Sequence, residues 1–263
     1  MDGAEEDPSF VDFALPDGRP RHIALRRRFA AGAGALRPGV MFLGGFKSDM
    51  KGAKASFLDD WARREGRALL RFDYSGHGES GGRFEEGAIG DWLEESFALL
   101  RAATEGPQIL VGTSMGGWIA LLLALRLVAA GRPPHALVLI APAVDFTEEL
   151  LWRTAGEEAR RVIMEEGVWL RPSAYAPEPT PITRRLVEEG RAHLLLGGPI
   201  RVHAPVHILQ GMRDEDVPYA HALRLVDCLS GDPVSLSLIV DGDHRLSRPQ
   251  DLDHLLATLE AID

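Results

Sequence analysis

One short stretch limits the possible folds of this chain more than any other: Gly112-Thr113-Ser114-Met115-Gly116, with the pattern G-x-S-x-G. Residues 109–111 before it are apolar and largely β-branched, which is typical of a buried strand, and residues 119–128 after it favour a helix. A serine between a strand and a helix occupies a tight turn in which side chains at both glycine positions would collide. The pattern therefore predicts a turn that presents the Ser114 hydroxyl beside the first helical amides, where a nucleophile would stand. The alternative is an ordinary glycine-rich turn.

Apolar strands alternate with amphipathic helices along most of the chain. Strands are expected at residues 11–15, 22–29, 40–43, 68–72, 109–111, 136–140, 206–209 and 235–240, and helices at residues 53–64, 89–104, 119–128, 219–229 and 250–262. Such alternation predicts an α/β fold with a mostly parallel central sheet, helices on both faces and right-handed crossovers.

Residues 144–205 break this alternation. They read as a charged helix at 146–166, a stretch with four prolines at 171–181 and a second helix at 182–193. We expect a helical cap at 144–205, inserted into a core formed by residues 1–143 and 206–263. Its apolar residues Trp152, Trp169 and Leu170 are candidates for lining an acyl pocket, and the alternative is that they only pack the cap onto the core.

Two partners for Ser114 follow later strands. A serine hydroxyl becomes an effective nucleophile when a neutral imidazole takes its proton and a carboxylate orients that imidazole. Asp214 and His244 each lie in a loop directly after an expected strand, and the order Ser, Asp, His is that of a known hydrolytic triad. Asp216 is the alternative acid, whereas Asp243 adjoins His244 and is expected only to shape its loop.

The loop after residues 40–43 is expected to supply an oxyanion-binding amide. It begins with Gly44 and Gly45, and we assign the donor to the amide of Phe46 or of a residue next to it. The second donor is the amide of Met115, directly after Ser114. Each such donor is worth about 2.7–4 kcal/mol in the transition state.

A second glycine-rich run, residues 73–81, follows the strand expected at 68–72. It has the pattern D-x-x-G-x-G-x-S and contains His77. Because His77 precedes Ser114 in a turn and lacks the place after the last strand that His244 has, we read the run as structural.

Composition disfavours several classes of partner. The chain has 29 Lys and Arg against 39 Asp and Glu, a net charge of -10, which disfavours nucleic acid and anionic membranes. No apolar run approaches the roughly 20 residues of a membrane span. A single cysteine, Cys228, and an acidic start without signal-peptide features predict a cytoplasmic protein. The triad chemistry requires neither a metal nor an organic cofactor.

Several distant motifs give the chain a resemblance to the α/β-hydrolase superfamily, and within it to the family of α/β-hydrolase-domain-containing protein ten. They are Arg71-Phe72-Asp73-Tyr74-Ser75-Gly76, Pro107-Gln108-Ile109-Leu110-Val111-Gly112 with Ser114 and Gly116-Gly117-Trp118, Gly167-Val168-Trp169 with Pro172-Ser173 and Tyr175, Gly211-Met212 with Asp214 and Val217-Pro218, and Asp243-His244-Arg245. The pieces within the cap are the ones most specific to this family, and the likeness spans residues 35–260.

The resemblance implies an α/β-hydrolase fold and hydrolysis of acylated thioesters or esters, such as palmitoyl-proteins and acyl glucuronides. It assigns nucleophile, acid and base to Ser114, Asp214 and His244. The chain departs from the family in showing no mitochondrial transit peptide, and its Ala- and Arg-rich composition resembles that of bacterial proteins. Two other functions remain open: a serine peptidase, and a hydrolase-like binding protein without turnover.

Overall fold

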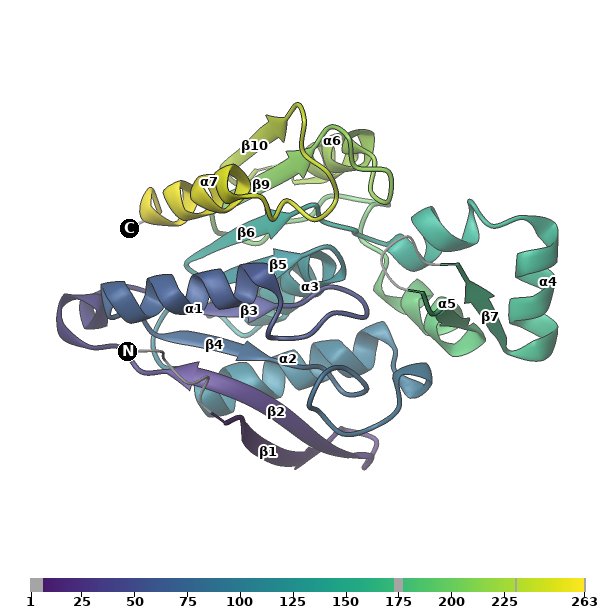
Figure 1. Cartoon of the computed structure of the whole chain (residues 1–263), viewed down its shortest axis with the longest axis horizontal. Coiled ribbons are helices and arrows are strands. Elements are labelled where there is room, and N and C mark those ends of the chain that lie inside the picture. Colours follow the sequence, from purple (N-terminus) through teal and green to yellow (C-terminus); the bar gives the residue numbers. More distant parts are fainter. Residues whose placement is uncertain (1–6, 173–176, 230, 263) are drawn as a thin grey trace.

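The chain is built on one eight-stranded sheet (Figure 1). The computed structural model describes residues 7–172, 177–229 and 231–262. The strand order is β1-β2-β4-β3-β5-β6-β9-β10. β1 pairs antiparallel with β2 and β2 antiparallel with β4, and every pairing from β4 to β10 is parallel. The strands are β1 (Ser9–Ala14), β2 (Pro20–Arg28), β3 (Gly39–Leu43), β4 (Leu69–Phe72), β5 (Gln108–Thr113), β6 (Ala136–Ile140), β9 (Val206–Gly211) and β10 (Val234–Ile239).

Helices cover both faces of the sheet, as the sequence predicts. One face packs against α1 (Ala53–Glu65) and α7 (Pro249–Glu260), and the other against α2 (Ile89–Ala103), α3 (Met115–Ala129) and α6 (Tyr219–Cys228). Strand β5 lies in the middle and is buried over Gln108–Gly112, because its neighbours β3 and β6 and both helical layers exclude water. The predicted α/β fold with a mostly parallel sheet is confirmed. The carboxyl ends of the parallel strands share one edge, so the loops after β3, β5, β9 and β10 converge there.

The turn between β5 and α3 requires its glycines. A Cβ at Gly112 would collide with the carbonyl oxygen of Gly116, and one at Gly116 would collide with the carbonyl oxygen of Leu43. Both obstacles are backbone atoms, which cannot rotate away. The turn therefore holds α3 against the end of β3.

We expect Gly116→Ala to lower the free energy of unfolding by about 1–3 kcal/mol, the usual cost of overpacking. Urea denaturation measures this difference. Gly197→Ala is the matched control, because a Cβ at Gly197 meets no atom within 4 Å and the residue has no positive φ. Equal stabilities of the two variants would contradict the steric account.

The insertion between β6 and β9 differs in detail from the expected pair of helices. A π-helical segment (Thr147–Trp152) and α4 (Glu157–Glu166) replace one long helix, because the chain breaks at Gly156, which is extended with φ of -65° and ψ of 164°. A hairpin of β7 (Val168–Arg171) and β8 (Thr180–Thr183) precedes α5 (Arg184–Gly190). This hairpin was not predicted, since the prolines between its strands mask the pairing. Of the family-specific residues named above, Ser173 and Tyr175 lie outside the described residues.

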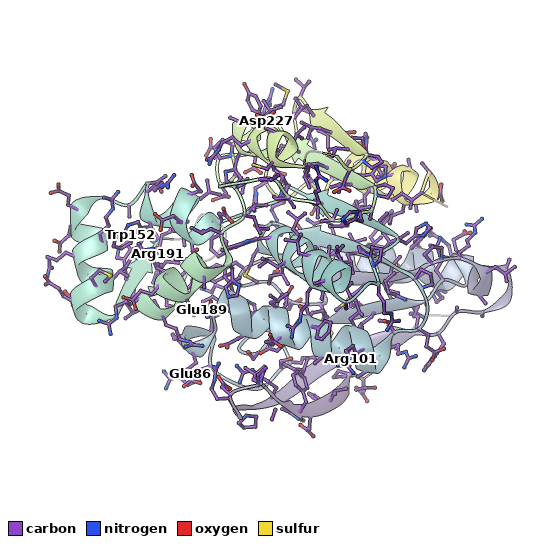
Figure 2. The ribbon with its side chains drawn as sticks, turned by 180° about the vertical axis from the view of Figure 1, so that it is seen from behind. Glu86, Arg101, Trp152, Glu189, Arg191 and Asp227 are labelled. Atoms are coloured by element: carbon purple, nitrogen blue, oxygen red, sulfur yellow. The ribbon has the colours of Figure 1, made fainter. Side chains whose placement is uncertain are left out.

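Helix α5 attaches the insertion to the core. The carboxylate of Glu189 accepts hydrogen bonds from the Gly90 amide at 3.0 and 3.1 Å, at the positive end of α2. Arg185 donates to the buried Asp91 at 2.8 Å. Figure 2 shows Glu189 on the insertion, beside the first turn of α2. The insertion is therefore tied to the core near the edge where the loops converge.

Candidate active site

The structure brings the three predicted catalytic residues into one hydrogen-bonded row. His244 Nε2 lies 3.1 Å from Ser114 Oγ, and His244 Nδ1 lies 2.8 Å from Asp214 Oδ2. The three residues come from the loops after β5, β9 and β10, which meet because these parallel strands end at the same edge of the sheet. Ser114 is partly accessible, whereas the Asp214 side chain is fully buried. The row can pass a proton from the hydroxyl to the imidazole while the carboxylate orients the ring.

Every acceptor position of the Asp214 carboxylate is used. Oδ1 accepts from the amides of Asp216 and Val217 at 3.0 and 2.8 Å, and Oδ2 accepts from His244 and from Gln210 Nε2 at 3.1 Å. Asp214, Asp216 and His244 lie close enough to suggest a metal site, with ligand atoms within 4.8 Å of one another. Since a carboxylate offers about four acceptor positions, Asp214 has none left for a cation.

Gln210 is a contributor that the sequence analysis missed. Its amide nitrogen faces three acceptors: the Asp214 carboxylate and the carbonyl oxygens of Gly211 and Val217. Because all three neighbours accept, the orientation of the amide is fixed, and the side chain restrains Asp214 through a hydrogen bond of 3.1 Å. The signal in the sequence was a polar residue near the end of a strand, where the pattern calls for an apolar one. In the structure this residue is fully buried.

The turn at Ser114 carries backbone strain. Ser114 has φ of 53° and ψ of -119°, a conformation that costs a non-glycine residue on the order of 1–3 kcal/mol. Its geometry is over-determined by hydrogen bonds from the Ser114 amide to Ile140 and from the Gly117 and Ala143 amides to the Ser114 carbonyl. Met115 opens α3, so its amide has no acceptor within that helix.

The loop after β3 reaches the same site. A Cβ at Gly45 would lie 3.4 Å from Ser114 Cβ, so the two backbones are near contact. Among the described residues, no acceptor pairs with the amides of Phe46 and Met115, whereas the Lys47 amide donates to His77 Nε2 at 3.1 Å. Of these two neighbouring amides, that of Lys47 is therefore already hydrogen-bonded, whereas that of Phe46 is available to a substrate oxygen.

A cavity of about 410 Å³ opens beside Ser114, within the usual range for small-molecule sites. Most of its lining is apolar, and its charged side chains are few. The apolar part consists of Phe46, Met115, Ala143, Phe146, Leu150, Leu151, Pro172, Ile182 and Val217, and the polar part of Lys47, Ser114, Arg171, Thr180, Asp216 and His244. The cavity can therefore hold an acyl group next to the row of Ser114, His244 and Asp214.

The three side chains predicted to line an acyl pocket do not line this cavity. Trp152 is instead flanked by Arg160 and Arg191, whose guanidinium carbons lie 5.6 and 5.0 Å from its ring centroid. Figure 2 shows Trp152 and Arg191 side by side on the insertion. Leu170 lies on the outer face of the β7–β8 hairpin and is exposed. Trp169 pairs across the hairpin with Ile182, which does line the cavity. The period of two along β7 explains why Arg171, rather than Leu170, faces the cavity.

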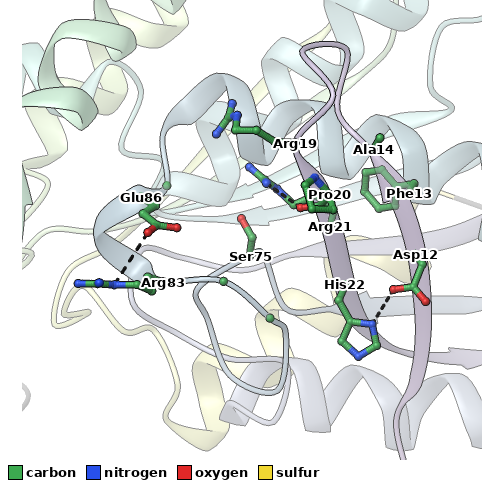
Figure 3. A pocket seen from close by; sticks show the side chains of 13 residues that line it. Asp12, Phe13, Ala14, Arg19, Pro20, Arg21, His22, Ser75, Arg83 and Glu86 are labelled. Atoms are coloured by element: carbon green, nitrogen blue, oxygen red, sulfur yellow. Dashed lines mark hydrogen bonds and ion pairs between the residues drawn. The ribbon is translucent and has the colours of Figure 1, made fainter.

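A second cavity, of about 750 Å³, lies away from Ser114, between the β1–β2 hairpin and the loop after β4 (Figure 3). Its charged side chains are largely paired. Arg19 binds Asp91, Arg21 binds Glu95, and His22 faces Asp12 on the neighbouring strand at 2.7 Å. The arginine pairs tie the β1–β2 hairpin to α2, and the His22–Asp12 pair joins its two strands.

His77 lies against the loop after β3 and is neutral at neutral pH. It is buried, and burial lowers its pKa to about 4. Its Nδ1 donates to the Ser75 carbonyl at 3.2 Å, and its Nε2 accepts from the Lys47 amide. The prediction that His77 has no place in the row of Ser114, Asp214 and His244 agrees with this position.

The pKa of His77 predicts an acid-sensitive component of stability. Between pH 4 and about 6.5 the unfolded chain binds a proton at His77 that the folded chain does not, so stability rises with pH across that window. We expect the proton that the unfolded chain binds at His77 to lower the free energy of unfolding by about 3 kcal/mol between neutral pH and pH 4. Urea denaturation at a series of pH values from 4 to 7 gives the free energy of unfolding as a function of pH. This free energy should rise less steeply with pH for His77→Phe than for wild type. Equal slopes would contradict a buried neutral His77.

Comparison with known proteins places the chain in a family. A family model described as "Serine aminopeptidase, S33" matches residues 36–185. The mouse protein named "Palmitoyl-protein thioesterase ABHD10, mitochondrial" is 36% identical over 228 residues, which are 86% of this chain and 75% of the mouse protein. The chain belongs to the ABHD10 family of α/β-hydrolases. It is therefore a hydrolase.

Solved structures agree with the family assignment of this hydrolase. A putative hydrolase from Agrobacterium vitis S4 superposes with a TM-score of 0.92 and 45% identity, covering 98% of this chain and 99% of that one. Mouse alpha/beta hydrolase domain-containing protein 10 gives a TM-score of 0.84 and 32% identity, covering 98% of each chain. The resemblance drawn from the sequence motifs is confirmed.

The comparison contradicts the predicted cytoplasmic location. The relatives from mouse, cattle and human are all named as mitochondrial. The prediction was wrong because a single cysteine and an acidic first segment do not encode a compartment. Within the described residues, no helix has the length and apolar character that crossing a bilayer requires.

Proposed function

We propose that this hydrolase cleaves esters or thioesters of acyl groups through a covalent intermediate on Ser114. The observation that carries the proposal is the row of hydrogen bonds from Ser114 Oγ through His244 to Asp214, at 3.1 and 2.8 Å. In the proposed organisation, residues 144–205 cap the site on a core of residues 1–143 and 206–263.

The first half of the reaction transfers the acyl group to the enzyme. His244 Nε2 takes the hydroxyl proton as Ser114 Oγ bonds to the acyl carbonyl carbon, and the carbonyl oxygen becomes an oxyanion. The amides of Phe46 and Met115 donate to that oxyanion. The bond to the leaving alcohol or thiol then breaks, and His244 returns the proton to that leaving group.

The second half releases the acid. Water loses a proton to His244 Nε2 and attacks the acyl-enzyme carbonyl, which forms a second oxyanion. Its collapse breaks the bond between Ser114 Oγ and the acyl carbon, and His244 returns the proton to Oγ. The carboxylate of Asp214 remains ionised throughout and stabilises the imidazolium form of His244. No step draws on a metal or an organic cofactor.

The apolar cavity supports acyl substrates, and the names of the relatives support thioesters among them. The matched family description also raises a serine aminopeptidase as the second candidate. An aminopeptidase has to bind an ammonium group, yet besides His244 the charged side chains of the cavity are Lys47, Arg171 and Asp216, two cations against one acid. This charge balance favours acyl esters and thioesters over free amino termini.

Turnover of matched substrates tests the proposal. Para-nitrophenyl esters from two to sixteen carbons, an acyl thioester of the best chain length and an aminoacyl-para-nitroanilide are compared under the same conditions. We expect turnover of the esters and the thioester, with a maximum at one chain length, and none of the anilide. Hydrolysis of the anilide alone would establish the peptidase instead.

A further inference from the structure

The loop after β3 that carries the proposed donor Phe46, called the oxyanion loop below, needs support from its surroundings because its own conformation is strained. Lys47, directly after Phe46, is a non-glycine residue with φ of 58°. Such a residue rarely adopts this conformation unless its surroundings impose it. The proposed donor amide of Phe46 belongs to the preceding peptide, so the orientation of that amide depends on what holds Lys47.

His77 restrains Lys47 through a hydrogen bond that requires one specific tautomer of its ring. Its Nε2 accepts the Lys47 amide hydrogen at 3.1 Å, which requires the ring proton to sit on Nδ1. The Nδ1 proton is in turn donated to the Ser75 carbonyl at 3.2 Å. The two hydrogen bonds agree with each other, and each uses one ring nitrogen.

The ring of His77 is fixed by aromatic neighbours on several sides. The ring centroids of Tyr74, Phe84 and Trp92 lie 5.7, 5.1 and 5.3 Å from that of His77. Phe84 also packs on the ring of Phe46, at 4.9 Å. The same cluster therefore fixes both the acceptor nitrogen and the residue that carries the proposed oxyanion donor.

We propose that His77 is a positioning residue for the oxyanion loop: by accepting the Lys47 amide, it keeps the Phe46 amide directed toward the substrate oxygen. His77 itself does not touch the substrate. The inference rests on the proposed function, since it concerns the transition state of that reaction. It gives the run of residues 73–81 a role that its sequence pattern does not reveal.

Three variants test the proposal by steady-state kinetics on the best para-nitrophenyl ester. His77→Phe keeps an aromatic ring and removes the acceptor, and we expect kcat to fall about 10–100-fold with KM within twofold. That loss is smaller than the 10²–10³-fold cost of deleting a donor outright, because the Phe46 amide is loosened and not removed. His77→Gln restores an acceptor at a similar reach, and we expect it to recover most of kcat. Tyr74→Phe is the matched control for the cluster, with kcat within twofold of wild type.

The outcomes separate this inference from the proposed function. Failure of wild type to turn over any ester would overturn the proposed function. An active wild type with a folded His77→Phe of unchanged kcat would overturn the role of His77, as would a Gln variant no better than the Phe variant. Should His77→Phe fail to fold, nitrogen-15 NMR of the wild-type ring decides: a proton on Nδ1 supports the proposal, and a proton on Nε2 overturns it.

Discussion

Ser114→Ala should reduce kcat for ester hydrolysis by roughly 10⁴–10⁶-fold, the loss that removal of the nucleophile causes in serine hydrolases. Alanine leaves the turn intact, since it removes only Oγ, and the φ of 53° is already imposed by the surrounding backbone. The oxyanion amides and the cavity remain, so a small residual rate over water is expected. Steady-state kinetics and thermal unfolding of the same preparation measure the two properties together.

Ser235→Ala is the matched control for this change. Ser235 is an exposed serine on β10 that hydrogen-bonds His207, outside the lining of the cavity beside Ser114. We expect its kcat and KM to stay within twofold of wild type. A Ser114→Ala variant that retained more than a tenth of wild-type kcat would refute the nucleophile assignment.

Asp214→Asn should lower kcat by about 10⁴-fold, because an amide cannot accept from all four donors that surround this position. If the asparagine oxygen keeps the amides of Asp216 and Val217, its NH₂ group faces His244 Nδ1. The imidazole then carries its proton on Nε2, toward Ser114, and cannot accept the hydroxyl proton. The pH dependence of kcat/KM for both proteins measures the effect.

Asp216→Asn distinguishes the two acids that the sequence leaves open. Asp216 lines the cavity, but it is Asp214 whose carboxylate contacts the ring of His244 at 2.8 Å. We expect Asp216→Asn to lose less than tenfold in kcat/KM. The reverse order of effects would transfer the role of the acid to Asp216.

The sequence predicted best those features that depend on local pattern and chain order. The strand before Ser114, the helix after it and the later loops bearing Asp214 and His244 are each readable from a few neighbouring residues. Since parallel strands end at one edge, their order along the chain was enough to bring the three residues together.

Features set by tertiary contacts could not be read in this way. Trp152 faces two arginines because the helix expected at 146–166 breaks at Gly156, and Arg160 then folds back over the ring. His77 accepts from an amide 30 residues earlier in the chain, which only the packed fold brings within hydrogen-bond distance. Gln210 donates to Asp214 four residues later, but the burial of its side chain depends on tertiary packing. The predicted cytoplasmic location was wrong for a different reason, since the composition of a chain does not specify its compartment.

The most direct test of the central claim is peptide mapping by mass spectrometry after reaction with a fluorophosphonate. We expect one adduct, on the peptide that contains Ser114, with labelling slowed by an excess of the best ester and abolished in Ser114→Ala. An unlabelled wild type, or an adduct on another serine that accompanies loss of activity, would contradict the claim that Ser114 is the nucleophile.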